Sequence, residues 1–193
     1  MRLRIIAFAS VVVAAMGVAS LATPAQAQPI EKDRHCVTNA SMPNAPTTCY
    51  GSFTEAMAKA TAGRITDAPA DAQAALNDRR LQERLGATGA KKNGVGPMAL
   101  APISIMYRDV NFGGGSWVIS GEFDCTGPTD NWDYWMPYVG DSWNDSIGSY
   151  RAYRNCWLKL FEHRDFGGGS IDFFGDRLGL GILDDEVSSI VWS

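Results

Sequence analysis

The sequence predicts an all-β sandwich of two Greek keys at the C-terminus, preceded by a small helical and irregular N-terminal region. An aromatic residue followed later by Phe-Gly-Gly-Gly-Ser occurs twice, at residues 107–116 and 161–170, which indicates a tandem structural unit. Helix caps and helical apolar spacing are found before residue 86, whereas short runs rich in β-branched and aromatic residues follow residue 101.

The chain begins with a secretory signal pattern. Residues 1–4 are basic at two positions, residues 5–22 are apolar without a charge, and Ala25-Gln26-Ala27 fits a signal-peptidase site. We therefore expect residues 1–27 to be a signal peptide and the mature protein to be secreted and extracellular, with no membrane segment after cleavage. The alternative is a retained anchor, because the apolar stretch reaches the lower limit of about 17–18 residues for a membrane span.

Residues 28–49 form a polar segment that holds two of the four cysteines. An even number of cysteines in an exported chain predicts disulfide bonds, and four cysteines allow three pairings. We favour Cys36–Cys49, which closes a short loop, and Cys125–Cys156, which lies within the C-terminal domain. A zinc site is the rival interpretation, but the chain has no Cys-x-x-Cys spacing and only two histidines.

Two short helices are expected between residues 50 and 86. Ser52 begins a Ser-x-x-Glu capping box for the first, at residues 53–62. Asp71 is the N-cap candidate of the second, at residues 72–85.

A linker is expected at residues 87–100, because Gly-rich polar sequence does not bury enough surface to order itself. On the sequence alone, residues 28–100 are either a pro-segment or a small domain that packs on the C-terminal unit.

Residues 101–193 should form the β domain, with Greek keys at 102–154 and 155–193. The Gly triplets of the repeat supply positive φ and close backbone approach in a folded hairpin. The first key is longer around residues 125–140, which we expect to be a disulfide-tethered surface loop. Clustered aromatic residues in such a polar loop are candidates for contact with a partner: Trp132, Trp135 and Tyr138.

The C-terminal domain is acidic. Residues 101–193 carry six Lys or Arg against fourteen Asp or Glu, a net charge of −8. This surface lacks the positive footprint that nucleic acid requires, so no nucleic-acid partner is expected. It suits a domain that attracts cations or basic surfaces.

Each Greek key ends in an acidic loop: Asn144-Asp145-Ser146-Ile147-Gly148-Ser149 and Asp184-Asp185-Glu186-Val187-Ser188-Ser189. A hard cation such as calcium prefers carboxylate, carbonyl and hydroxyl oxygens, and these loops offer such ligands within six residues. The alternative is that the residues are only turn formers, because Asp, Asn and Ser side chains readily bond loop backbone.

These residues resemble the microbial βγ-crystallin family of double Greek-key domains, and the arrangement is similar to the secreted actinomycete metalloproteinase inhibitors of the same fold. The resemblance rests on the acidic loops and on an aromatic-x4-Phe-x-Gly hairpin at Tyr107/Phe112/Gly114 and Phe161/Phe166/Gly168. It implies a calcium-binding domain in which the ligands are Asp184, the Glu186 carbonyl and Ser188, with Asn144 and the Ser146 carbonyl from the partner loop.

The first loop departs from the family signature at its fifth position. Gly148 has no hydroxyl, whereas Ser188 provides one at the same position of the second loop. We hypothesise that, of two calcium sites, the one that needs the missing hydroxyl is weakened or lost, and that the one using Ser188 persists.

Catalysis is not expected, because the chain has no Gly-x-Ser-x-Gly nucleophile elbow and His163 lies inside the repeated hairpin. The favoured function is a secreted calcium-binding protein whose ion stabilises the double Greek-key domain. The first alternative is a peptidase inhibitor that presents a disulfide-tethered loop to a secreted protease. The second is a toxin, or a module that binds cell wall or glycan.

Overall fold

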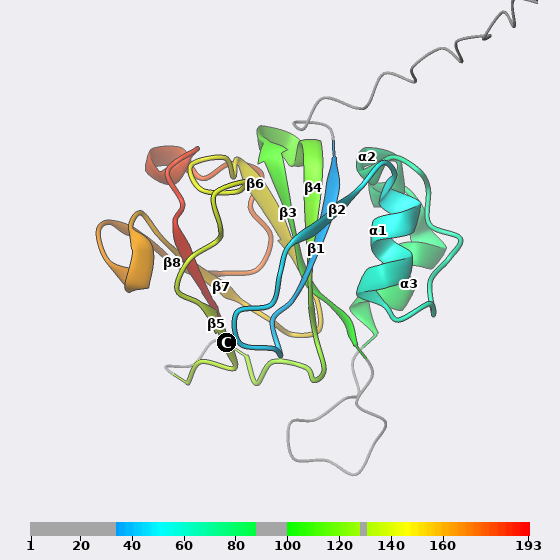
Figure 1. The fold of residues 1–193 in the computed structure, drawn as a ribbon, viewed down its shortest axis with the longest axis horizontal. Coiled ribbons are helices and arrows are strands. Elements are labelled where there is room, and N and C mark those ends of the chain that lie inside the picture. The colour runs from blue at the N-terminus through cyan, green and yellow to red at the C-terminus, as the bar shows by residue number, and fades with distance from the viewer. Residues whose placement is uncertain (1–33, 88–99, 128–130) are drawn as a thin grey trace, which may run out of the picture.

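The computed structural model describes residues 34–87, 100–127 and 131–193. Two β-sheets pack on each other, and three short helices lie beside one of them (Figure 1). The predicted signal peptide lies outside the described residues, as does most of the predicted linker. Within the described residues, no helix is both long enough and apolar enough to span a bilayer.

The first sheet has five strands in the order β2-β1-β4-β3-β6. Their bounds are β1 (His35–Asn39), β2 (Thr48–Tyr50), β3 (Ala101–Asp109), β4 (Gly113–Gly121) and β6 (Ser149–Ala152). All neighbours are antiparallel except β1 and β4, which run parallel with Cys36 opposite Trp117. The N-terminal region, expected to be helical and irregular, therefore also completes this sheet. The pairing buries the Cys36–Cys49 disulfide against the sheet, since Cys36 is 2% exposed.

The second sheet has four antiparallel strands in the order β5-β9-β7-β8. Their bounds are β5 (Tyr134–Met136), β7 (Leu158–Phe161), β8 (Ser170–Phe174) and β9 (Ser189–Trp192). Each repeat unit contributes to the sheet of the other. β5 of the first unit pairs with β9 in the second sheet, and Arg177 of the second unit forms a β-bridge with Tyr150 in the first sheet.

The region around residues 125–140 is therefore not simply the surface loop expected from sequence. It supplies β5, and Asp133 and Tyr134 are buried. The Tyr134 hydroxyl donates to the carbonyl of Phe123 at 2.8 Å and accepts from the Phe123 amide at 2.9 Å, which ties this strand to the end of β4. The Cys125–Cys156 disulfide closes the region at its base, in the pairing favoured from sequence.

The two repeated hairpins have the same backbone. Each holds a 3-10 turn, η2 (Val110–Phe112) or η3 (Arg164–Phe166), with two successive residues at positive φ. In the first copy, the Ser149 hydroxyl donates to the carbonyl of Asp109 at 2.6 Å and accepts from the amide of Phe112 at 2.9 Å. Ser189 makes the equivalent bonds in the second copy. The hydroxyl of the last serine in each acidic loop is thus already hydrogen-bonded to the backbone of its hairpin.

The core between the sheets is rich in aromatic residues. The rings of Trp117 and Trp143 stack with centroids 5.2 Å apart. The indole N–H of Trp192 donates to the Ser104 hydroxyl at 3.0 Å, so this buried polar group is satisfied. These three tryptophans are fully buried, whereas Trp157 is only partly buried.

The helices are α1 (Phe53–Ala60), α2 (Ala72–Leu76) and α3 (Arg79–Gly86). Ser52 caps α1 by accepting from the amide of Glu55, and Asp71 caps α2 by accepting from the amide of Ala74.

The prediction of a single second helix at residues 72–85 is wrong, because α2 and α3 occupy this region. Asp78 accepts a hydrogen bond from the amide of Leu81 and so starts a new helix, a local alternative that Asp offers to the backbone.

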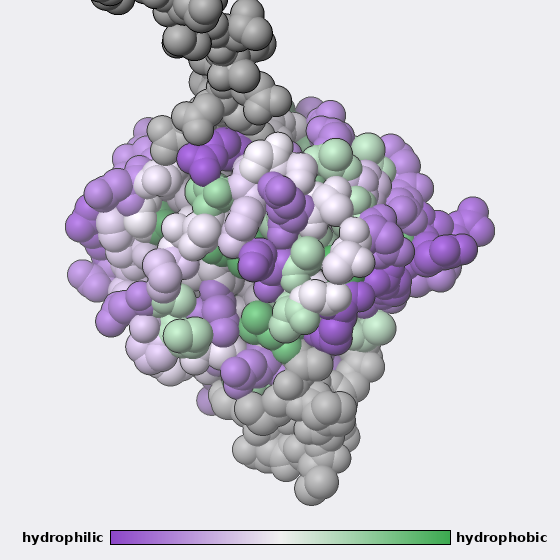
Figure 2. Space-filling view, turned by 45° about the vertical axis from the view of Figure 1, so that its right-hand side comes forward, coloured by the Kyte–Doolittle hydropathy of each residue, from purple (hydrophilic) through white to green (hydrophobic). Residues whose placement is uncertain are grey.

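These helices pack on the outer face of the first sheet. They share a second apolar cluster with residues of β3 and β4: Phe53, Met57, Ala60, Leu81 and Leu85 meet Ile105, Tyr107 and Val118. The two central strands are therefore buried on both faces. Residues 53–86 are thus a packed part of the domain in this structure. In Figure 2, the right-hand edge of the molecule, on the side of the helices, is mostly hydrophilic.

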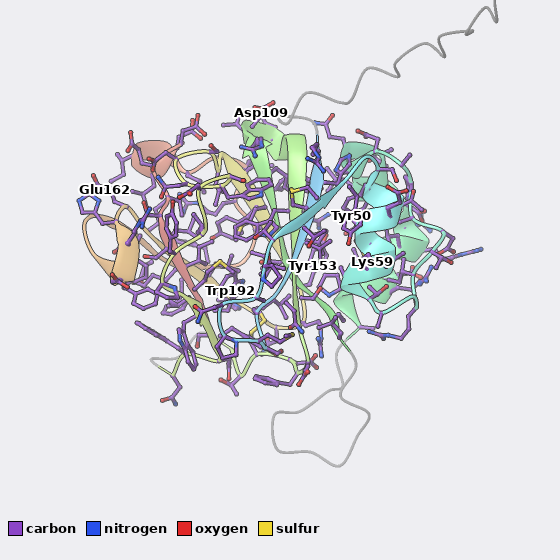
Figure 3. All side chains as sticks on the ribbon, viewed as in Figure 1. Tyr50, Lys59, Asp109, Tyr153, Glu162 and Trp192 are labelled. Atoms are coloured by element: carbon purple, nitrogen blue, oxygen red, sulfur yellow. A yellow bond between two sulfur atoms is a disulfide. The ribbon has the colours of Figure 1, made fainter. Side chains whose placement is uncertain are left out.

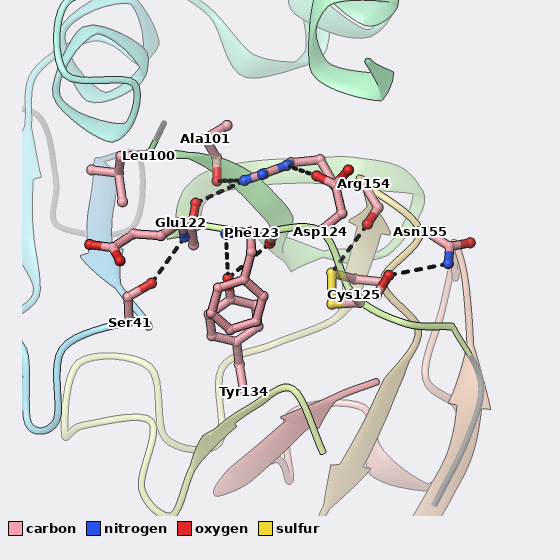
Figure 4. Close-up of polar contacts among 12 residues, drawn as sticks. Ser41, Leu100, Ala101, Glu122, Phe123, Asp124, Cys125, Tyr134, Arg154 and Asn155 are labelled. Carbon is pink, nitrogen blue, oxygen red and sulfur yellow. Dashed lines mark hydrogen bonds and ion pairs between the residues drawn. A yellow bond between two sulfur atoms is a disulfide. The ribbon is translucent and has the colours of Figure 1, made fainter. Parts of the chain in front are cut away.

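A buried arginine joins two parts of the first sheet near the Cys125–Cys156 disulfide. The Arg154 guanidinium lies 2.5 Å from the Asp124 carboxylate and donates to the carbonyl of Gly121 at 2.8 Å (Figure 4). Its side chain is 3% exposed, so this ion pair is shielded from water. The cluster links the end of β4 to the chain that leaves β6.

Candidate metal centre

The two acidic loops lie side by side and pair reciprocally. The amide of Asp145 donates to the carbonyl of Val187, and the amide of Asp185 donates to the carbonyl of Ile147, both at 3.3 Å. The donors are the second residues of the two loops and the acceptors are the fourth. The pair therefore has approximate twofold symmetry, which follows from the repeat in the sequence.

The loops share one backbone shape. Asp145 and Asp185 have φ values of 53° and 57°, in the left-handed region that Asp tolerates better than most residues. Ile147 and Val187 are both fully buried and anchor the loops in the core. Core packing thus holds the intervening polar atoms in place, and a site on packed elements is better pre-organised than one on free loops.

In the first loop, Asn144 and Ser146 differ in how their side chains are satisfied. The Asn144 side-chain nitrogen donates to the Asp145 carboxylate at 2.6 Å, and the Ser146 hydroxyl donates to the Asn144 carbonyl at 3.1 Å. The side-chain oxygen of Asn144 is buried and has no hydrogen-bond partner among the described residues. A buried oxygen without a donor is costly unless something positive lies against it.

In the second loop, Asp184 and Glu186 are exposed and their side chains are open to solvent. Ser188 is buried, and its amide donates to the carbonyl of Phe161 at 2.9 Å. The carboxylate, carbonyl and hydroxyl oxygens that calcium prefers are thus available from this loop.

The fifth position differs between the loops. The amide of Gly148 donates to the carbonyl of Tyr107 at 3.0 Å, matching the bond that Ser188 makes. A Cβ placed on Gly148 would lie 2.7 Å from the Arg108 carbonyl oxygen and 2.8 Å from the Asp109 carbonyl carbon. The backbone of residues 108–110 lies too close to Gly148 for a side chain. The first loop therefore lacks a hydroxyl at this position and has no space for one.

An open hollow of about 600 Å³ lies beside the first loop. Of the five predicted ligands only Ser146 lines it; the other lining residues are Arg108, Asp109, Asp141, Ser142, Asp145 and Asp185. These carboxylates were not predicted as ligands from the sequence, although two of them, Asp145 and Asp185, are the second residues of the first and second loop. Asn144, Asp184, Glu186 and Ser188 do not line this hollow.

Arg108 is basic, whereas the other four charged residues that line the hollow are aspartates. Its guanidinium donates to the carbonyl of Ser142 at 2.8 Å and lies 4.3 Å from the centre of the Trp143 ring. The equivalent position in the second unit is Glu162, whose carboxylate accepts from the amide of Gly169 at 2.8 Å. Figure 3 shows Asp109 and Glu162 at the periphery, on the two repeated hairpins. Close to its guanidinium, Arg108 opposes a bound cation, whereas Glu162 adds negative charge at the equivalent position of the second unit. The four aspartates of the hollow still attract cations.

Among the described residues, no three His, Cys, Asp or Glu side chains gather closely enough to hold a metal on their own. An ion at these loops would need backbone carbonyls and hydroxyls as well as carboxylates. Such mixed oxygen ligands suit calcium, which accepts six to eight of them in flexible geometry.

The three aromatic residues proposed as partner contacts are not in one place. Trp132 packs edge-on against Phe166, with ring centroids 4.8 Å apart, so it covers the second hairpin. Trp135 and Tyr138 line a groove that is larger than the hollow beside the first acidic loop. The hydrogen bond from the Tyr138 hydroxyl to the Asp141 carboxylate raises the pKa of this tyrosine.

Among solved structures, the chain is similar to an archaeal βγ-crystallin, with 29% identity over 47% of this chain and 95% of that chain, at a TM-score of 0.34. It is also similar to a βγ-crystallin domain from Flavobacterium johnsoniae, with 26% identity over 47% of this chain and 93% of that chain, at a TM-score of 0.35. The N-terminal domain of protein S is 18% identical, over 47% and 93% of the two chains, at a TM-score of 0.34. No protein-family model and no curated protein matches the chain.

Proposed function

We propose that this protein is a secreted calcium-binding protein, and that one ion, held on the Ser188 side of the paired loops, stabilises its β domain. The observation that supports the proposal is the reciprocal pairing of the two loops, which brings their oxygen atoms together from sequence positions 40 residues apart (Asp145 and Asp185).

The proposed ligands are those expected from sequence. Asp184, the Glu186 carbonyl and the Ser188 hydroxyl would come from the second loop, with Asn144 and the Ser146 carbonyl from the first. The buried side-chain oxygen of Asn144, which lacks a partner among the described residues, supports a cation in this region. When bound, calcium would supply positive charge that no side chain of these two loops provides.

The ion would act on stability. A ligand that binds only the folded state stabilises it by mass action, by about 2.7 kcal/mol when its concentration is 100 times the dissociation constant. For a chain of this size that corresponds to a rise in melting temperature of about 5–11 °C. Extracellular calcium would then set the stability of the exported protein.

The test is thermal unfolding of the chelator-treated mature protein with and without calcium. Asp184→Asn and Ser188→Ala should each remove most of the calcium-dependent rise in melting temperature. Two matched controls should retain it: Asp172→Asn, an exposed aspartate on β8, and Ser142→Ala, in the hollow that holds Arg108. An equal loss in the controls, or no rise in the unmodified protein, would remove the basis of this function.

A further inference from the structure

A groove of about 790 Å³ lies on a part of the molecule that the proposed calcium site does not use. One wall is the turn that joins β1 to β2, and the other is the segment that carries β5 and continues to residue 143. A volume of this size is typical of protein sites that bind small molecules or short segments of chain.

Both walls are fixed in position. The Ser41 hydroxyl accepts from the amide of Glu122 at 3.0 Å, which attaches the β1–β2 turn to the end of β4 (Figure 4). The hydroxyls of Thr38 and Thr47 are 2.8 Å apart across the same turn. The two disulfides close one wall each, at Cys36–Cys49 and Cys125–Cys156. A groove held in this way loses little conformational freedom when it binds.

One wall of the groove contains an edge strand. In the described part of the chain, β5 pairs only with β9, and all three residues of β5 line the groove. An edge strand presents backbone N–H and C=O groups that an extended peptide can bond. The open edge of β5 is short, and the exposed side chain at its centre, Trp135, lines the groove.

The charges of the groove are all of one sign. Glu122, Asp133 and Asp141 line it, and no Lys, Arg or His is among its lining residues. Asp133 is nearly fully buried and its carboxylate accepts two hydrogen bonds from Thr126, at 2.7 and 2.9 Å. A cationic occupant would therefore be favoured over an anionic one.

The aromatic side chains suit the same kind of occupant. Trp135 is 59% exposed, and no cation stacks on its ring among the described residues. The neighbouring Tyr138 already carries a guanidinium: that of Arg164, which lies 3.5 Å from the ring centre and 3.7 Å from the Asp141 carboxylate. Arg164 therefore provides an example, within the protein, of an arginine that binds between an aromatic ring and a carboxylate on this surface.

We propose that the groove binds an extended segment of a partner protein in which Arg or Lys alternates with apolar residues. The cationic side chain stacks on Trp135 and faces Glu122, while the backbone of the segment runs along the open edge of β5. The apolar residues of the segment meet Met42 on the opposite wall, which is 56% exposed. This site is independent of the calcium proposal.

The test uses two fluorescein-labelled pentapeptides, Arg-Val-Arg-Val-Arg and Glu-Val-Glu-Val-Glu, titrated with the full mature protein and followed by fluorescence anisotropy. Measurements in chelator and in calcium separate this site from the acidic loops. The Arg peptide should bind in both conditions and the Glu peptide in neither. Binding should weaken as salt rises, because exposed charge pairs are screened.

Matched variants locate the site. Trp135→Ala should weaken binding of the Arg peptide by about tenfold, the scale of a partly desolvated cation–π contact. Glu122→Gln should weaken it by about threefold, the scale of an exposed charge pair. Phe174→Ala, an exposed aromatic on the far edge strand β8, and Glu83→Gln, an exposed acid on α3, should leave it unchanged.

Three outcomes would overturn the proposal. The first is the absence of Arg-peptide binding by folded protein. The second is binding that Trp135→Ala and Glu122→Gln do not weaken more than the controls do, which would indicate diffuse attraction to an acidic surface. The third is displacement of the Arg peptide by chitohexaose, a neutral oligosaccharide, at equal or lower concentration, which would identify the groove as a glycan site.

Discussion

Replacing Gly148 by serine completes the sequence signature of the first acidic loop, yet we expect it to destabilise the protein and to add no calcium site. A Cβ at this position would lie 2.7, 2.8 and 2.9 Å from backbone atoms of Arg108, Asp109 and Val110, where ordinary contacts are 3.4–4 Å. The backbone has to move by roughly half an ångström or more, and overpacking of this kind costs about 1–3 kcal/mol. The melting temperature should fall by about 2–12 °C.

The assay is thermal unfolding of Gly148→Ser in chelator, followed by near-ultraviolet circular dichroism, and then calorimetric titration with calcium. Gly175→Ser is the matched control, because a Cβ there meets nothing within 4 Å. The control should melt close to the unmodified protein. A Gly148→Ser protein of unchanged stability that binds one more calcium ion than the unmodified protein would refute the reasoning.

Three further perturbations test the packing of the fold. Arg154→Met should destabilise the protein by about 3–5 kcal/mol in denaturant unfolding, because it removes the ion pair of a mostly buried carboxylate; a loss under 1 kcal/mol would contradict the role of this ion pair. Replacing both Cys125 and Cys156 by serine removes a 31-residue cross-link and should cost about 3–4 kcal/mol, checked in the same way against the reduced and oxidised parent. Burial raises the pKa of Tyr134 and of Tyr153 to about 12. Their hydroxyls thus release protons more readily in the unfolded state, and stability should fall as pH rises from 10 to 12, with tyrosinate absorbance appearing together with unfolding.

The repeated hairpins could be predicted because their chemistry is local. The Gly triplets recur in both units, and the two disulfides join cysteines that lie close in sequence or within one domain. The expected positive φ is found only at the middle glycine of each triplet, Gly114 or Gly168, and the two residues before each triplet adopt it as well. Strands β8 and β9 are two of the short runs rich in β-branched and aromatic residues that follow residue 101.

What could not be predicted depends on contacts distant in sequence. β1 joins the first sheet by parallel pairing with β4, and such pairing leaves no pattern in the five residues of β1 themselves. The division of the second helix at Asp78 is a local competition that helical spacing does not reveal. The charge of Arg108 beside the first loop follows only from the folded hairpin, since 36 residues separate it from Asn144.

The central claim is that the paired loops hold one calcium ion and not two. Isothermal calorimetric titration of the chelator-treated mature protein measures the number of ions directly. The account predicts a single saturable site per chain that is lost in Ser188→Ala and retained in Ser142→Ala. Two equivalent sites, or no saturable heat at millimolar calcium, would contradict it.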